Sequence, residues 1–172
     1  MTSFWIAAFG PTLAQGDFLR DCLIPAFMPD FHKGSADEEI PVGVGNLIIV
    51  TQSCDLENAK VQYVALCPLH SLAEFEDGNP NYRQKGKWEE VRKGRVEGLH
   101  LLASPSQPEN NREALVVDFR QIISLPFAYL SDHADSLGQR WRLESPFLEH
   151  FSQAFARFFM RVGLPSAIPA FK

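Results

Sequence analysis

The chain has 172 residues, 45% hydrophobic and 22% charged, which is typical of a single folded domain spanning residues 1–172. Its net charge of −5 argues against broad, non-specific nucleic-acid binding, although a local basic site is compatible with it. No apolar run approaches the roughly 18 residues of a membrane span, so we expect no membrane association. Three cysteines without paired spacing indicate free thiols in a reducing, cytoplasmic compartment.

The first half of the chain predicts three strands. A strand over 16–25 starts at a Gly-Asp pair, and two further strands are expected over 46–52 and 61–68. Pro68 is expected to end the third strand. The polar connector 57–60 is short, so the second and third strands are predicted to form an antiparallel hairpin.

The segment NLIIVTQSCD, residues 46–55, is the main candidate for chemistry. Leu47–Val50 is an unbroken apolar run of a core strand, and it leads directly into hydroxyl, amide, thiol and carboxylate side chains. Gln52, Cys54 and Asp55 are therefore the candidate catalytic residues. The alternative is a turn, in which Asp55 caps a short helical turn and Cys54 is a small buried residue.

Two other arrangements involve the same cysteine. Cys54, Cys67 and His70 offer three metal ligands, but no second close pair completes a site, so we expect no metal and no cofactor. A Cys54–His70 catalytic pair would need the imidazole beside the thiol. The predicted hairpin instead puts these two residues at its opposite ends.

The second half of the chain predicts a helix over 82–93 and strands over 99–103, 114–125 and 139–144, of which 114–125 is a strand over 114–119 followed closely by another over 121–125. The helix lies in the basic segment RQKGKWEEVRKGR, residues 83–95. An aromatic ring among basic residues could stack on a base while its neighbours hold phosphates, and the candidate nucleic-acid-binding residues here are Lys87, Trp88, Arg92 and Lys93. The alternative is a solvated helix face on which glutamates 89 and 90 pair with Arg92 and Lys93.

A C-terminal amphipathic helix is predicted over 146–162. Ser145 is a suitable N-cap, and Pro146 suits the first helical position. Arg157 and Arg161 lie on the polar side and complete the candidate nucleic-acid-binding set. The apolar stripe exceeds what a lone surface helix needs, which predicts a homodimer with this helix near the interface. The stripe consists of Phe147, Leu148, Phe151, Phe155, Phe158, Phe159 and Val162.

Four segments together resemble a known family. The sequence GDFL opens a strand at residue 16, LIIVTQSCDLENAK and YVALCPL form the hairpin at 47–69, ALVVDFRQIISLP covers 114–126, and a helix over 145–162 closes the chain. This order resembles the PemK/MazF-like family, small antiparallel SH3-like barrels whose best-known members are endoribonuclease toxins. The resemblance implies a mainly β (α+β) fold: a twisted antiparallel SH3-like barrel with helical insertions and a C-terminal amphipathic helix.

The chain departs from this family at the catalytic positions. The family has its catalytic arginine just before the second strand and its catalytic Thr or Ser after the proline of the third. Here these places hold Gly45-Asn46 and Leu69-His70. Two functions therefore stay open. One is a divergent toxin–antitoxin or defence protein that acts on RNA as an endoribonuclease with other residues. The other is a non-catalytic binding module that docks a protein partner, such as an antitoxin or a defence complex.

Overall fold

A computed structural model describes residues 3–27, 39–58 and 60–160. These residues form a mixed α/β fold with an eight-stranded antiparallel sheet and five α-helices. The strands are β1 (Trp5–Phe9), β2 (Asp17–Pro25), β3 (Val42–Ile49), β4 (Tyr63–Ser71), β5 (Leu99–Leu102), β6 (Leu115–Asp118), β7 (Ile123–Pro126) and β8 (Gln139–Leu143). The helices are α1 (Ser53–Glu57), α2 (Leu72–Gly78), α3 (Lys87–Arg92), α4 (Phe127–Ser136) and α5 (Phe147–Phe159), with short 3-10 segments η2 (Pro80–Arg83) and η3 (Asn111–Glu113).

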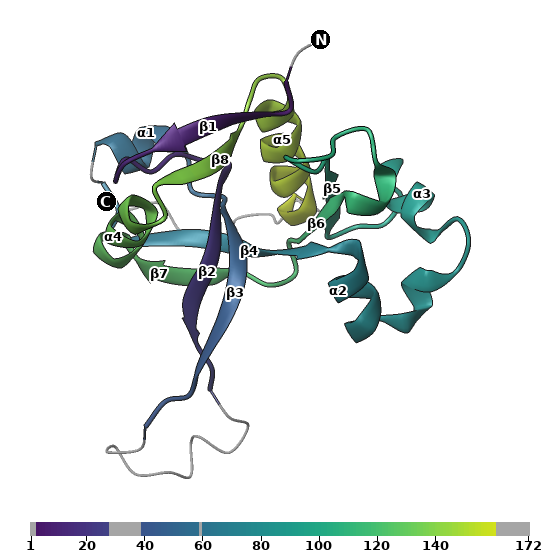
Figure 1. The fold of residues 1–172 in the computed structure, drawn as a ribbon, viewed down its shortest axis with the longest axis horizontal. Coiled ribbons are helices and arrows are strands. Elements are labelled where there is room, and N and C mark those ends of the chain that lie inside the picture. Colours follow the sequence, from purple (N-terminus) through teal and green to yellow (C-terminus); the bar gives the residue numbers. More distant parts are fainter. Residues whose placement is uncertain (1–2, 28–38, 59, 161–172) are drawn as a thin grey trace, which may run out of the picture.

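The sheet has the strand order β1-β8-β2-β3-β4-β6-β5, and β7 pairs with another part of β4. The predicted antiparallel hairpin is confirmed, because β3 and β4 pair with Leu47 opposite Pro68. In Figure 1 the β2–β3 ribbon extends beyond the other strands. Among the described residues no ladder joins β1 to β5, so hydrogen bonds do not close the sheet into a barrel.

The apolar run of β3 is explained by burial on both of its faces. Leu47 and Ile49 pack in a cluster with residues of α4, whereas Ile48 and Val50 pack in a cluster with Phe151 of α5. Because side chains alternate along a strand, a strand covered on both sides needs apolar residues at every position. The helices α4 and α5 thus hold the two cores on either side of the sheet.

An ion cluster fixes the start of β2 against β8. The carboxylate of Asp17 is fully buried and accepts from Arg140 Nε at 3.1 Å and from Arg142 Nε at 2.5 Å. Arg140, itself buried, also donates to the carbonyl oxygens of Gly10, at 2.7 Å, and of Thr12. The Gly-Asp pair that opens the strand therefore has a structural role in holding β1, β2 and β8 together.

Helix α5 packs against the chain's own core. Phe151 is fully buried, and Leu148, Phe155 and Phe158 lie against the same cluster. Phe159 stays 55% exposed. The helix has no side-chain N-cap, contrary to the expectation for Ser145, because the Glu144 carbonyl already accepts from the first helical N–H groups. Since most of the stripe is used within the chain, the predicted dimer depends on the exposed end of the helix and stays a prediction.

Two other expectations differ from the structure, and a third is confirmed. β4 does not end at Pro68 but runs to Ser71, because the proline lies where β4 leaves β3 and begins to pair with β6. The pair of strands expected within 114–125 is confirmed as β6 and β7, which are separated by a turn in which Asp118 Oδ1 accepts from the Arg120 backbone N–H at 3.0 Å. The helix expected over 82–93 is divided into η2 and α3.

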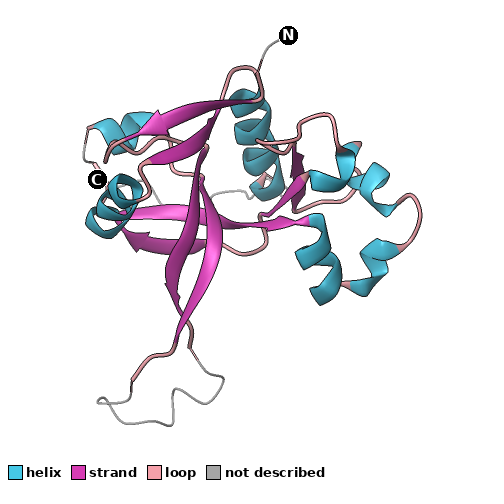
Figure 2. Ribbon diagram, viewed as in Figure 1, coloured by secondary structure: helices cyan, strands magenta, loops and turns pink. Residues whose placement is uncertain are grey.

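The chain between β4 and β6 forms a small core of its own. Helices α2 and α3 lie beside β5 and β6, away from α1 and α4, as Figure 2 shows. Phe75, Val91 and Val116 are buried in this core, and Tyr82 and Trp88 pack against them. No described helix has the length and apolar character that crossing a membrane would require.

Candidate functional site

A bulge in β2 is the starting point of the candidate site. The register of β2 on β3 shifts between Leu19 and Cys22. Asp21 lies in this bulge with φ +53°, a left-handed conformation that aspartate tolerates better than most residues. Its backbone N–H donates to Asn46 Oδ1 at 3.2 Å. Bulges redirect side chains and are frequent next to functional sites, so the bulge marks a place where function is expected.

Helix α4 holds the bulge from the other side. The hydroxyl oxygen of Tyr129 accepts from the Leu23 N–H at 2.7 Å. The ring Nε2 of His133 lies 2.7 Å from the Arg20 carbonyl oxygen, the distance of a hydrogen bond in which the ring nitrogen donates. Backbone groups that the bulge leaves unpaired are thereby satisfied, and the backbone of the bulge is held against α4.

The opposite wall comes from the end of β4 and the start of α2. His70 follows Pro68 on β4 and lies 6.0 Å, ring to ring, from Phe75. Ser71 caps α2 in a capping box: its hydroxyl accepts from the Glu74 N–H at 3.2 Å, and Glu74 Oε2 accepts from the Ser71 N–H at 2.7 Å. The cap therefore fixes the carboxylate of Glu74 near His70.

Between these walls lies a pocket of about 520 Å³, here called the bulge pocket. Two carboxylates, one imidazole and two amides supply its polar side chains, and among the described residues no lysine or arginine lines it. Such a set favours a cationic or hydrogen-bond-donating group and disfavours a phosphodiester. The polar residues are Asp21, Asn46, His70, Glu74 and Gln121.

The predicted catalytic residues lie together elsewhere, at the start of α1, where Gln52 is the N-cap residue. Cys54 Sγ is 3.7 Å from Gln52 Oε1 and 3.9 Å from Asp55 Oδ1, and Asp55 pairs with Lys60 at 3.6 Å. Cys54 is exposed, contrary to the alternative in which it is buried. None of the three lines the bulge pocket. The atoms that contact the thiol are acceptors rather than the cation that stabilises a thiolate.

Two other side chains of this motif accept hydrogen bonds from backbone N–H groups. Thr51 Oγ1 accepts from the Ala65 N–H at 2.8 Å, and Ser53 Oγ accepts from the Gln15 N–H at 3.0 Å. The motif thus ties the end of β3 to β4 and to the segment before β2. Its polar character is explained in part by this structural role.

The other two cysteines are buried, and the structure also bears on the metal site considered for Cys54, Cys67 and His70. Cys22 and Cys67 are buried without a disulfide, and burial raises the pKa of both thiols to about 12. His70 and Cys54 lie at opposite ends of the β3–β4 hairpin, as predicted, because Ile49 pairs with Leu66. Within the described ranges no three His, Cys, Asp or Glu side chains are grouped so that they could hold a metal ion.

The basic segment largely pairs its charges internally. Glu89 binds Arg92 through two hydrogen bonds of 2.7 Å and lies 3.3 Å from Lys93, as in the alternative of paired charges on a helix. The hydrogen bonds from Arg92 lower the pKa of Glu89 to about 2. Trp88 donates to Glu76 at 2.7 Å and its ring contacts the small core, so it does not stand free as a stacking platform. Lys87 is exposed.

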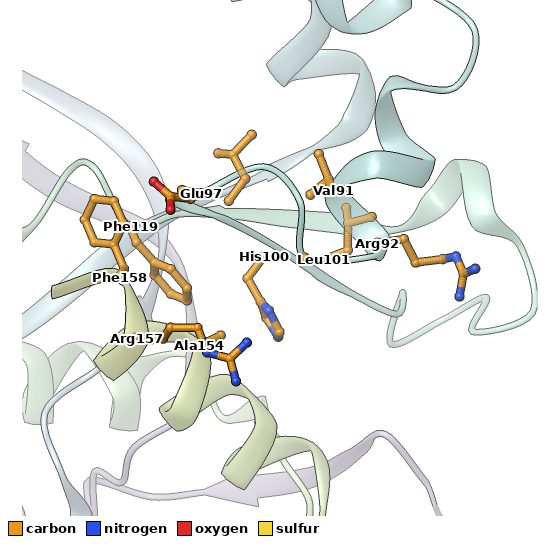
Figure 3. Close-up of a pocket in the computed structure, with 12 residues that line it drawn as sticks. Val91, Arg92, Glu97, His100, Leu101, Phe119, Ala154, Arg157 and Phe158 are labelled. Atoms are coloured by element: carbon orange, nitrogen blue, oxygen red, sulfur yellow. The ribbon is translucent and has the colours of Figure 1, made fainter. Parts of the chain in front are cut away.

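Arg92 and Arg157 lie on one pocket, although they come from segments far apart in the sequence. This second pocket, the α5 pocket, has a volume of about 190 Å³ and lies between the α3–β5 region and α5. Figure 3 shows His100 of β5 directed toward Arg157 of α5, with Arg92 on the other side. Phe119 and Phe158 contribute its aromatic wall. Arg161, the last predicted contact, lies outside the described residues.

Acid should weaken the fold through His100. Burial, assisted by the nearby charge of His150, lowers the pKa of His100 from 6.5 to about 4. As the pH falls from 6.5 toward 4, the unfolded chain takes up a proton that the folded chain does not, so stability falls, by roughly 2 kcal/mol at about pH 4.5. Urea unfolding should show that His100→Gln, which does not titrate, loses less stability than wild type over this range. A pH-independent difference between the two proteins would contradict the assignment.

No protein-family model, no curated protein and no solved structure matches this chain. The candidate site therefore stands on its own geometry. Of its residues, reasoning from the sequence drew attention to Asn46 and His70 as occupants of the family's catalytic places. It missed Asp21, Glu74 and Gln121. Ser71 followed three residues later by Glu74 was a readable capping signal, whereas the bulge that places Asp21 had none.

Proposed function

We propose that this chain is a binding module on a divergent, opened PemK/MazF-like SH3 barrel, and that its bulge pocket receives a cationic segment of a protein partner. The partner is an antitoxin or a component of a defence assembly. The proposal is supported by the position of the pocket. Gly45-Asn46 and Leu69-His70, which occupy the family's two catalytic places, come from different strands and all line it.

The charge of the bulge pocket favours the binding module over the ribonuclease. A ribonuclease needs cationic or hydrogen-bond-donating groups around the phosphate that it cleaves. The bulge pocket has carboxylates from Asp21 and Glu74 instead. Carboxylates accept hydrogen bonds from lysine and arginine, and arginine binds a carboxylate through two parallel bonds. A basic peptide segment therefore suits this pocket better than RNA does.

The experiment is co-purification with the product of the adjacent gene, in wild type and in the double variant Asp21→Asn, Glu74→Gln. Asparagine tolerates the left-handed backbone at residue 21, and glutamine keeps the capping box, so the double variant removes charge without removing either structural role. We expect its affinity to fall at least tenfold, since each hydrogen bond to a charged group contributes roughly 1.5–3 kcal/mol.

Asp77→Asn is the matched control, because this residue also lies on α2 but pairs with Arg83 outside the pocket. If Asp77→Asn weakened binding as much as the double variant does, the assignment of the bulge pocket as the binding site would be refuted.

Ribonuclease activity is the second candidate, and the presence of His70 in the bulge pocket favours it, because an imidazole can transfer protons in RNA cleavage. We expect RNA to stay intact with the wild-type protein. Cleavage that His70→Ala reduces about 100-fold or more would establish the ribonuclease and reject the binding module. Cleavage that depends on Cys54 and not on His70 would assign the chemistry to Gln52, Cys54 and Asp55.

A further inference from the structure

The protruding β2–β3 ribbon has one edge that α4 covers and one that stays open. On the β2 edge, the Leu23 N–H donates to the hydroxyl of Tyr129 in α4 at 2.7 Å, so it points away from β3. Leu23 lies opposite Val44 in the register, and the two therefore form a non-hydrogen-bonded pair. In such a pair the N–H and C=O groups of Val44 point away from β2, toward the outer edge of β3.

Val42 has the same arrangement. The Ala26 N–H donates to the Pro41 carbonyl oxygen at 2.8 Å, so these two residues form a hydrogen-bonded pair. The neighbouring pair of Pro25 with Val42 is then non-hydrogen-bonded, and the backbone groups of Val42 also point outward. In the part of the chain that the structure describes, no strand pairs with this edge at Val42 or Val44, and no other group forms a hydrogen bond there. The edge thus offers two donors and two acceptors.

The open edge adjoins the bulge pocket. The β3–β4 ladder ends at the pair of Leu47 with Pro68. Beyond this pair β4 continues toward α2, whereas β3 continues with β2 into the ribbon (Figure 1). Val44 of β3 and His70 of β4 both line the bulge pocket. The pocket therefore lies where a further antiparallel neighbour of β3 would be placed.

The sequence of this edge allows a second backbone to approach. Residues 42–46 read VGVGN and carry no charge, although exposed edge strands are commonly protected from pairing by charged residues or proline. Gly43 and Gly45 have no side chain, and glycine within a strand often marks the close approach of another backbone. Val42 and Val44 alternate with them and are 57% and 66% exposed. The edge thus combines free backbone groups with an apolar face.

We propose that a segment of the partner pairs with this edge of β3 as an additional antiparallel strand and places one basic side chain in the bulge pocket. This pairing rests on the proposed function and specifies how the cationic segment is held. The antiparallel direction follows from β4, whose place beside β3 the segment takes. Carboxylates of Asp21 and Glu74 attract the basic side chain, and the exposed Val42 and Val44 favour β-branched residues opposite them. Backbone hydrogen bonds provide affinity in this mode of recognition, and side-chain pockets provide specificity.

The probe is the acetylated and amidated heptapeptide Arg-Thr-Val-Thr-Val-Thr-Arg, titrated into the full chain and followed by NMR. We expect the amides of Val42 and Val44 to become protected from hydrogen exchange, with a nuclear Overhauser contact between the α-protons of Gly43 and of the central threonine. N-methylation of both valines of the peptide should weaken binding at least tenfold, because it removes the donors that face β3. N-methylation of the central threonine, whose N–H points away from β3, should leave the affinity unchanged.

Val44→Pro tests the same pairing from the side of the protein. Proline removes the outward N–H, and a sheet tolerates proline on an edge strand whose N–H faces solvent, so the fold should be kept. We expect the variant to bind the heptapeptide at least tenfold more weakly. Val44→Thr is the matched control, because threonine keeps both the N–H and the β-branched shape, and its affinity should stay close to that of wild type.

The outcomes separate the strand pairing from the proposed function. If the Asp21→Asn, Glu74→Gln protein binds more weakly while Val44→Pro and the N-methylated valines have no effect, the strand pairing is overturned and the cationic pocket stands. If only the backbone changes weaken binding, the strand pairing stands and the proposed role of the carboxylates fails. Absence of heptapeptide binding overturns the pairing. Protection of Val42 and Val44 that rises with protein concentration, without peptide, would assign the edge to a second copy of the chain and overturn it as well.

Discussion

Replacing Asp17 with alanine should destabilise the chain by roughly 3–5 kcal/mol, a large part of the 5–15 kcal/mol that stabilises a typical domain. The side chain of Asp17 is fully buried between the guanidinium groups of Arg140 and Arg142. Removing it leaves two like charges facing each other, and Arg140 cannot turn into solvent because it is buried as well. Breaking a buried pair in this way costs far more than the intact pair contributes.

Urea unfolding at constant pH measures this effect. Asp17→Asn keeps one acceptor oxygen and should give an intermediate loss, which makes it the useful variant if the alanine protein does not fold. Asp77→Ala removes the carboxylate of an exposed pair, Asp77–Arg83, and should cost about 1 kcal/mol or less. Similar losses for Asp17→Ala and Asp77→Ala would show that the buried cluster does not support the fold.

Replacing Phe151 with alanine should also cost roughly 3–5 kcal/mol. Phe151 is fully buried in the core between α5 and the sheet, with its ring 5.6 Å from that of Phe119. The substitution removes a large apolar side chain and leaves a cavity that its surroundings fill incompletely. Because α5 docks through this residue, the helix should also lose protection from hydrogen exchange.

Phe159 provides the matched comparison on the same helix. It is 55% exposed, and its ring contacts are with Phe155 and Phe158 of α5 itself. Phe159→Ala should therefore cost about 1 kcal/mol or less. If Phe159→Ala proved as damaging as Phe151→Ala, the helix would be held mainly through its exposed end, as the predicted dimer requires.

The strands that the sequence predicted best are those whose pattern is set by burial. The run Leu47–Val50 identified β3 because both faces of that strand are covered. β1 and α4 were not predicted. β1 has exposed apolar residues such as Phe9, and α4 has a weak stripe with two buried residues, so neither shows a clear period. Tertiary pairing rather than local preference places these two elements.

The candidate site was harder to predict, because its position depends on pairing between distant strands. The left-handed conformation of Asp21 results from a register shift between β2 and β3, and no local sequence motif predicts such a shift. The polar residues after β3 predicted a catalytic site, yet two of them, Thr51 and Ser53, accept hydrogen bonds from backbone N–H groups. A polar run after a strand is thus ambiguous between a site and a satisfied turn.

The central claim is that the bulge pocket binds a cationic segment of a protein partner. The most direct measurement is an NMR titration with an arginine-containing peptide from the adjacent gene product, beside the same peptide with citrulline in place of arginine. Citrulline keeps the shape and removes the charge. We predict at least tenfold tighter binding of the arginine peptide, with shifts centred on Asp21, Asn46 and His70, and loss of this preference in the Asp21→Asn, Glu74→Gln protein. Equal affinity for the two peptides, or shifts centred on α1 instead, would contradict it.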